Sequence, residues 1–160
     1  MGITITDAIH ALIALLDNCT LADEDDFVNH AYYSTVAFVP EYPLATEDVP
    51  TVAFSLAGGT NRRTGLGKCE RWHGTRLQLD VLAENPLYAR RIYEKVREVV
   101  LYDMDDGAGA SDGTYGSLYL YNAGVKDVEI GEAIPQVWDT DDAEHRIARL
   151  VADVYVTFED

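Results

Sequence analysis

Residues 75–102 read TRLQLDVLAENPLYARRIYEKVREVVLY, and this stretch decides the fold because it holds the two clearest periodicities in the chain. Apolar side chains at every second position predict a strand over 69–83 with one buried face. That face would carry Thr75, Leu77, Leu79 and Val81. Asn85 then suits a helix cap and Pro86 the first helical position. The helix predicted over 86–102 buries a single apolar stripe, formed by Tyr88, Ile92, Val96 and Val99.

The same rules predict the elements on either side. A helix over 6–18, capped by Thr6, has its apolar residues at helical spacing. Further strands are predicted over 27–39, 51–57, 117–121, 125–130 and 150–158, the third and fourth paired around 122–124. Helices thus alternate with groups of strands, so we predict an α+β fold. The sheet is mostly antiparallel, with the N-terminal and central helices packed on it.

Length and composition limit the possible classes of protein. The chain has 160 residues, a mass of 17.7 kDa and 48% hydrophobic residues, which predicts one folded domain over 1–160. We expect no membrane span, because no apolar run reaches the ~18–20 residues that a span requires. Cys19 and Cys69 are too few for a disulfide framework or a zinc site with four cysteine ligands.

Charge is distributed unevenly along the chain. The net charge is −16 in total, −9 over residues 1–61, +5 over 62–97 and −12 over 98–160. A surface this acidic should repel nucleic acid and anionic membranes. Self-repulsion of this size is easiest to tolerate in concentrated salt, where the Debye length falls to ~3 Å at 1 M, so we expect a salt-loving host.

The segment between the strands 51–57 and 69–83 is rich in glycine and basic residues. Residues 58–68 read GGTNRRTGLGK, which invites comparison with a phosphate-binding P-loop. A P-loop requires glycine where this chain has Arg62, serine or threonine where it has Cys69, and a helix downstream, where a strand is predicted. The segment is therefore predicted to be a long flexible hairpin loop, and loops of this length often contact a partner.

No group of residues predicts catalysis or metal binding. His10, His30, His73 and His145 are scattered, without the spacing of a metal motif. The acidic turn at 103–112 does not match the order of ligands in an EF-hand loop. We therefore expect no catalytic residue, no metal and no cofactor.

The order of these patterns resembles the tail-terminator and tail-completion proteins of long-tailed viruses (siphoviruses), including the minor tail protein U family. The resemblance starts with an N-terminal helix and the proline-led strand VPTVAF at 49–54. A glycine-containing hairpin loop, the strand LQLDVL at 77–82, the helix 86–102 and the closing strand VADVYVTF at 151–158 follow. Together with the acidity, this resemblance suggests a tailed virus of a haloarchaeon, and it leaves the terminator and completion subfamilies both open.

The resemblance implies a structural protein of the virion, assembled in the host cytoplasm and located at the neck between head and tail. Such proteins form rings, commonly of six subunits, which cap the tail tube, dock to the head–tail connector protein and let genomic DNA pass through the lumen. We expect the basic segment to contact an acidic surface of a neighbouring subunit or neck protein. The residues expected to make this contact are Arg62, Arg63, Lys68 and Arg71.

Two other classes of protein stay open on the sequence. One is a soluble halophilic enzyme or ligand-binding domain whose site forms only in three dimensions. A pocket holding several carboxylates with His73 or His145 would favour that class. The other is a cellular assembly factor that shares the fold.

Overall fold

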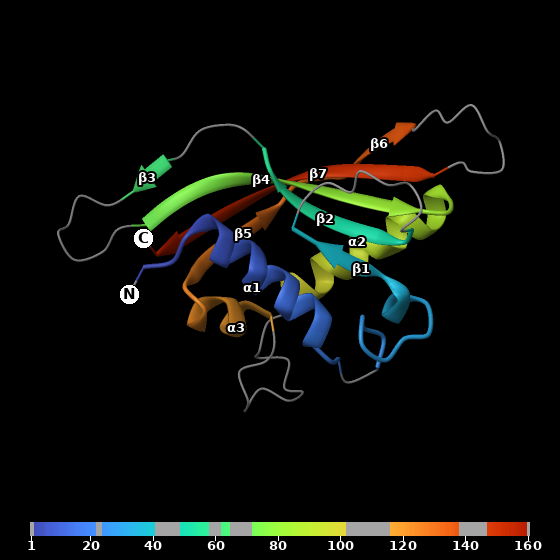
Figure 1. Ribbon diagram of the computed structural model, residues 1–160, viewed down its shortest axis with the longest axis horizontal. Helices are drawn as coiled ribbons and strands as arrows, with labels where there is room; N and C mark the ends of the chain where they lie inside the picture. The colour runs from blue at the N-terminus through green and yellow to red at the C-terminus, as the bar shows by residue number, and fades with distance from the viewer. Residues whose placement is uncertain are drawn as a thin grey trace.

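The strand and helix predicted from residues 75–102 form the centre of the structure, a computed structural model. It describes residues 2–21, 24–40, 49–57, 62–64, 72–101, 116–137 and 147–159. Its helices are α1 (Ile5–Asn18), the single 3₁₀ turn η1 (Tyr33–Thr35), α2 (Pro86–Val100) and α3 (Gly116–Asn122). Its strands are β1 (Ala37–Val39), β2 (Thr51–Leu56), β3 (Arg62–Thr64), β4 (Trp72–Ala83), β5 (Val125–Ile130), β6 (Ile134–Val137) and β7 (Ala148–Glu159). The α+β fold with a mostly antiparallel sheet is confirmed (Figure 1).

A long antiparallel ribbon of β4 and β7 forms the middle of the sheet. These strands pair along their whole length, from Trp72 opposite Glu159 to Ala83 opposite Ala148. On the outer edge of β4, β2 pairs with one half and β3 with the other. On the outer edge of β7, β5 and β6 divide the strand in the same way. The short β1 joins β2 in parallel and makes the sheet mixed.

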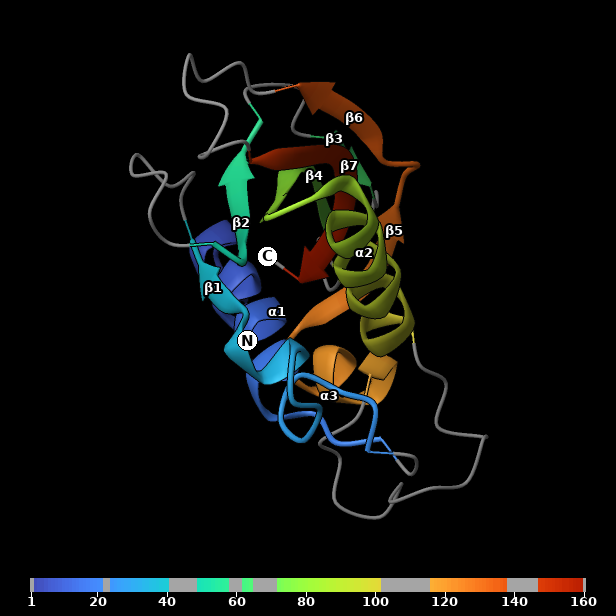
Figure 2. The same cartoon turned by 90° about the vertical axis from the view of Figure 1, so that its right-hand side faces the viewer.

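The helices cover one face of this sheet. Figure 2 shows α1, α2 and α3 on the same side, with α1 beside β1 and β2. The alternate residues of β4 and β7 that face the helices are buried, as the sequence pattern predicted. Large apolar side chains of α1 and α2, such as Leu12, Leu16 and Ile92, are fully buried against them. Burying each contributes about 1.5–3 kcal/mol to stability, which fixes the helices on this face.

The two predicted helix starts have different outcomes. Asn85 caps α2, its side chain accepting a hydrogen bond from the backbone N–H of Tyr88, and Pro86 is the first helical residue, as predicted. The cap predicted at Thr6 is wrong, because α1 is capped by Thr4. Thr4 has Asp7 three residues later, so the two side chains satisfy each other's backbone N–H groups in a capping box.

Two predicted strands are wrong in whole or in part. Residues 117–121 lie in α3, whose Leu120 is buried, and β5 pairs with β7 instead of with this segment. Of the strand predicted over 27–39, only β1 is a strand. The preceding residues form turns because polar side chains hold their backbone: Asp26 accepts hydrogen bonds from two nearby N–H groups and His30 from two more.

The predicted hairpin between residues 51–57 and 69–83 is present as the antiparallel pair β2 and β4, but it is not one uninterrupted loop. Residues 62–64 form β3, which continues the pairing along β4. The flanking residues 58–61 and 65–71 lie outside the described ranges, as does the acidic turn 103–112.

Candidate interaction surfaces

The structure places two of the four predicted contact residues at one end of the β4–β7 ribbon. Arg62 and Arg63 belong to β3, where they pair with Gly74 and His73 of β4. Lys68 and Arg71 lie outside the described residues, in the connection between β3 and β4. The basic segment is thus attached to the ribbon end formed by the start of β4 and the end of β7 (Figure 1).

The opposite end of the ribbon is joined to an acidic sequence. β6 ends at Val137, paired with Ala148 at the start of β7. The residues between these strands include four acidic side chains and one arginine, namely Asp139, Asp141, Asp142, Glu144 and Arg146. Because β4 and β7 each have 12 residues, the two ends of the ribbon are about 35–40 Å apart. The sequence showed the charge blocks, but it could not show that the basic and acidic connections leave from opposite ends.

A buried ion pair lies on the sheet face away from the helices. Asp80 is 0% exposed, and its Oδ1 accepts hydrogen bonds from Arg149 Nε at 2.8 Å and Nη2 at 2.6 Å. Gln78 Nε2 donates to Asp80 Oδ2 at 2.9 Å, and Arg149 Nη1 donates to Gln136 Oε1 at 3.4 Å. Two donors from one guanidinium and one from an amide compensate the buried carboxylate. The pair joins β4, β6 and β7 into one rigid platform.

A second polar cluster ties α2 to the turn segment before β1. Lys95 is buried, with its Nζ 3.1 Å from Asp25 Oδ2 and 2.8 Å from Glu98 Oε2. Burial acts to lower the pKa of Lys95, but the hydrogen bonds to Glu98 and Asp25 outweigh it and leave the pKa raised. The ammonium therefore stays charged and also lies over the ring of Tyr33. This lysine fixes the fold, and its charge is not available to a partner.

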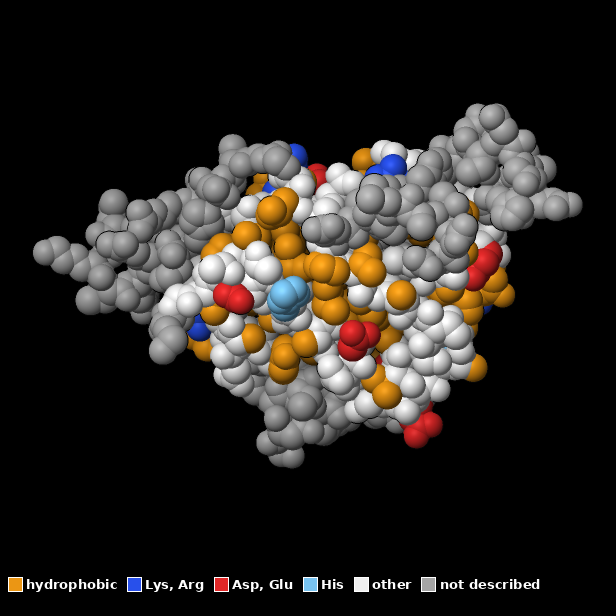
Figure 3. Space-filling model, viewed as in Figure 1, with side chains coloured by type: hydrophobic (Ala, Val, Ile, Leu, Met, Phe, Trp, Pro, Cys, Tyr) orange, Lys and Arg blue, Asp and Glu red, His pale blue; other side chains and the backbone are white. Residues whose placement is uncertain are grey.

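The surface over α1 carries little charge for so acidic a chain. Figure 3 shows hydrophobic side chains gathered over α1, with few charged ones among them. Asp7 and Asp17 are exposed acidic residues of this helix. Hydrogen bonds from the backbone and side chain of Thr4 lower the pKa of Asp7, whereas partial desolvation by the neighbouring chain raises that of Asp17. A face of this kind is suited to contact with protein more than with nucleic acid.

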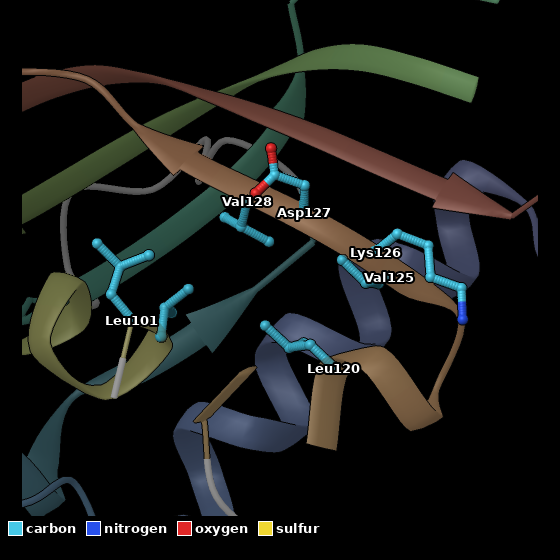
Figure 4. Close-up of a pocket in the computed structure, with 7 residues that line it drawn as sticks. Leu101, Leu120, Val125, Lys126, Asp127 and Val128 are labelled. Carbon is cyan, nitrogen blue, oxygen red and sulfur yellow. The ribbon is translucent and has the colours of Figure 1, made fainter. Parts of the chain in front are cut away.

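A shallow pocket lies between the end of α2, α3 and β5 (Figure 4). Its volume is about 140 Å³. Seven residues line it, five apolar and two charged: Val100, Leu101, Leu120, Val125, Val128, Lys126 and Asp127. Pockets for small-molecule ligands usually measure roughly 300–1,000 Å³. This one has room for a single small apolar group, and neither His73 nor His145 lines it.

The residues considered for metal binding or catalysis are not brought together in the described part of the chain. His10 is exposed on α1, and His30 Nδ1 accepts backbone hydrogen bonds from Tyr32 and Tyr33. Outside the described part of the chain lie His145, Cys69 and the side chain of His73. Cys19 is buried. Among the described residues, no group of three or more potential ligands could hold a metal ion, and no helix is long and apolar enough to cross a membrane.

Comparison with known proteins adds no family to these observations. No protein-family model matches the sequence, and no curated protein matches it.

Proposed function

We propose that this chain is a structural protein of the neck of a long-tailed virus. Copies of it form a ring, of six subunits by the resemblance, that terminates the tail tube and joins it to the head–tail connector. Genomic DNA passes through the lumen without specific binding, and the protein has no catalytic role. Tail-terminator and tail-completion positions both fit this proposal.

The observation that carries the proposal is the placement of unlike charge at the two ends of the β4–β7 ribbon. A ring built from one kind of subunit needs two different, complementary surfaces that meet head to tail. Arg62 and Arg63 of β3 lie at one end, and the connection with four acidic residues begins at the other. A contact between these ends would join each subunit to the next.

The element order also supports the proposal. An N-terminal helix, a strand that begins after Pro50, an antiparallel hairpin, the helix α2 and a long closing strand follow one another as in the viral family that the sequence resembles. The net charge of −16 fits a lumen through which DNA moves, because an acidic surface forms few phosphate contacts that would retard it.

Reversal of the charge on β3 tests the role of the basic segment. Arg62→Glu/Arg63→Glu should abolish ring formation in molar KCl while circular dichroism shows a folded subunit. The matched control, Arg62→Lys/Arg63→Lys, keeps the charge and should assemble like the wild type. If the glutamate variant formed rings as readily as the wild type, these arginines would have no part in the contact.

A further inference from the structure

The outward face of α2 combines three arginines with an exposed leucine near each end. Leu87 and Leu101 are 60% and 44% exposed. Arg90, Arg91 and Arg97 are exposed between them, whereas the lysine of this helix is buried. Arginine is enriched in protein–protein interfaces and lysine is depleted, so this composition is typical of a contact surface.

Two of these arginines carry charge that nothing on α2 compensates. Arg90 Nε lies 3.2 Å from Glu94 Oε1, and Glu98 is engaged by the buried lysine. Arg91 and Arg97 form no ion pair with the residues that the structure describes. We define the α2 face as Leu87, Arg91, Arg97 and Leu101. Glu94 and Glu98 are exposed on the same stripe of the helix, but Arg90 and Lys95 pair with them, so the charge left over on this stripe is that of the two arginines.

A complementary patch lies on the sheet face away from the helices, over β5 and β7. Asp127 and Glu129 of β5 are exposed, and Glu129 lies directly opposite Tyr155. Tyr155 is 47% exposed and Ile134, at the start of β6, is 64% exposed. We define the β5–β7 face as these four residues: Asp127, Glu129, Ile134 and Tyr155.

The acidic residues of the β5–β7 face are also uncompensated. The nearby Arg76 Nε lies 4.0 Å from Asp153 Oδ1 and makes no hydrogen bond, so among the described carboxylates this arginine is nearest to Asp153 and not to those of β5. Asp127 and Glu129 have no ion-pair partner within the described ranges. Their charge is therefore available to a positive surface on another molecule.

The two faces point in opposite directions. α2 packs on the helix side of β4 and β7, so its exposed stripe faces away from the sheet. Asp127, Glu129 and Tyr155 alternate with buried or half-buried residues such as Val156, so they lie on the other side of the sheet. Two unlike surfaces on opposite sides of a subunit are what a head-to-tail contact requires.

The dimensions of the faces agree. Leu87 and Leu101 are fourteen residues apart on a helix, which is about 21 Å. On the sheet, the partners of Asp127 and Ile134 on β7 are Thr157 and Val151, six residues or about 20 Å apart. On the α2 face Arg91 and Arg97 lie between the leucines, about 9 Å apart along the helix. On the β5–β7 face Asp127 and Glu129 are about 7 Å apart along the strand and lie together at the end away from Ile134.

We infer that the α2 face of one copy docks on the β5–β7 face of a second copy, with Arg91 and Arg97 against Asp127 and Glu129. The inference rests on the proposed ring, for which it supplies a contact along the subunit flank. One exposed leucine of the helix then lies toward Ile134, and Tyr155, directly opposite Glu129, is covered by the helix. Repeated head to tail, the contact closes a ring or extends a filament.

Charge exchange between the faces tests this inference. The variant Arg91→Glu/Arg97→Glu has its α2 face reversed, and the variant Asp127→Lys/Glu129→Lys has its β5–β7 face reversed. Each alone should need at least about a hundredfold higher concentration to assemble than the wild type, measured as mass at the lowest KCl concentration at which the wild type assembles. An equimolar mixture should assemble again, because every contact in alternating order pairs opposite charges. Glu24→Lys, which changes an exposed acidic residue outside both faces, is the control and should assemble normally.

The outcomes separate the inference from the proposed function. If the wild type forms rings and either variant does so equally well, the inference is overturned and the ring stands. If both variants fail and their mixture also fails, these faces do not touch each other and the inference is again overturned. A wild type that stays monomeric removes the ring and this contact together. Should Arg91→Glu/Arg97→Glu lose its fold by circular dichroism, Arg91→Gln/Arg97→Gln replaces it with the same expectation of weakened assembly.

Discussion

Removal of Arg149 should leave a buried carboxylate without its counter-charge. Asp80 is fully buried, whereas the Arg149 side chain is 21% exposed to solvent. Asp80 loses both donors of the guanidinium in Arg149→Met and keeps only the amide of Gln78. Breaking a buried pair from one side costs about 3–5 kcal/mol. In a chain of this length the midpoint of thermal unfolding should fall by about 6–20 °C.

The double variant Asp80→Leu/Arg149→Met separates the ion pair from the shape of the site. Both charges are then absent, and a well-packed apolar pair is often as stable as the ion pair it replaces, so most of the lost stability should return. The assay is thermal unfolding followed by circular dichroism at one protein concentration in molar KCl. If Arg149→Met lost less than about 1 kcal/mol, or if the double variant were no more stable than Arg149→Met, the buried pair would not be a critical part of the platform.

Three further predictions concern caps, pH and salt. Thr4→Ala removes the capping box of α1 and should lower the free energy of unfolding, measured in urea, by about 0.5–2 kcal/mol. An unchanged free energy of unfolding would contradict the assigned cap. Burial acts to raise the pKa of Asp26, but hydrogen bonds from Leu21, Asn29 and Val28 outweigh it and lower the pKa. The ionised Asp26 therefore stabilises the fold fully above about pH 4, and this contribution is lost as the pH falls through the lowered folded-state pKa. Asp26→Asn should make the free energy of unfolding depend less on pH in this acidic range. An unchanged pH dependence would refute the assignment. With a net charge of −16, the unfolding midpoint should rise from low salt to molar KCl, and a constant midpoint would refute the expected halophilic adaptation.

Elements with a strong local signal could be predicted from the sequence. The alternation before Asn85 and the cap at Asn85–Pro86 predicted β4 and the start of α2, and both are confirmed. The alternation from Leu150 predicted the buried face of β7. In each case, a long periodic segment leaves one choice of element, since a strand and a helix would bury different residues.

Short segments and long-range pairs could not be predicted in this way. Residues 117–121 are too few to separate a strand from a helix, and the buried Leu120 of α3 suits either. The alternation put Asp80 on the polar face, yet this face is buried there because Arg149 lies beside it from 69 residues away. Only the pairing of β4 with β7 brings these residues together, and no local pattern contains that pairing.

The candidate interaction surfaces were predictable in charge but not in position. The basic block containing Arg62 and Arg63 was visible in the sequence, whereas its location at one end of a ribbon depends on the register of β3 with β4. The sequence could not show that Asp127 and Glu129 lie on the side of the sheet opposite α2, because that position follows from the pairing of β5 with β7.

The central claim is that this protein acts by assembling with copies of itself, and its mass in solution tests that most directly. Light scattering with electron microscopy of the purified chain in molar KCl should show closed rings with a mass several times 17.7 kDa. A single species at the mass of one chain, unchanged with rising protein concentration, would contradict the account.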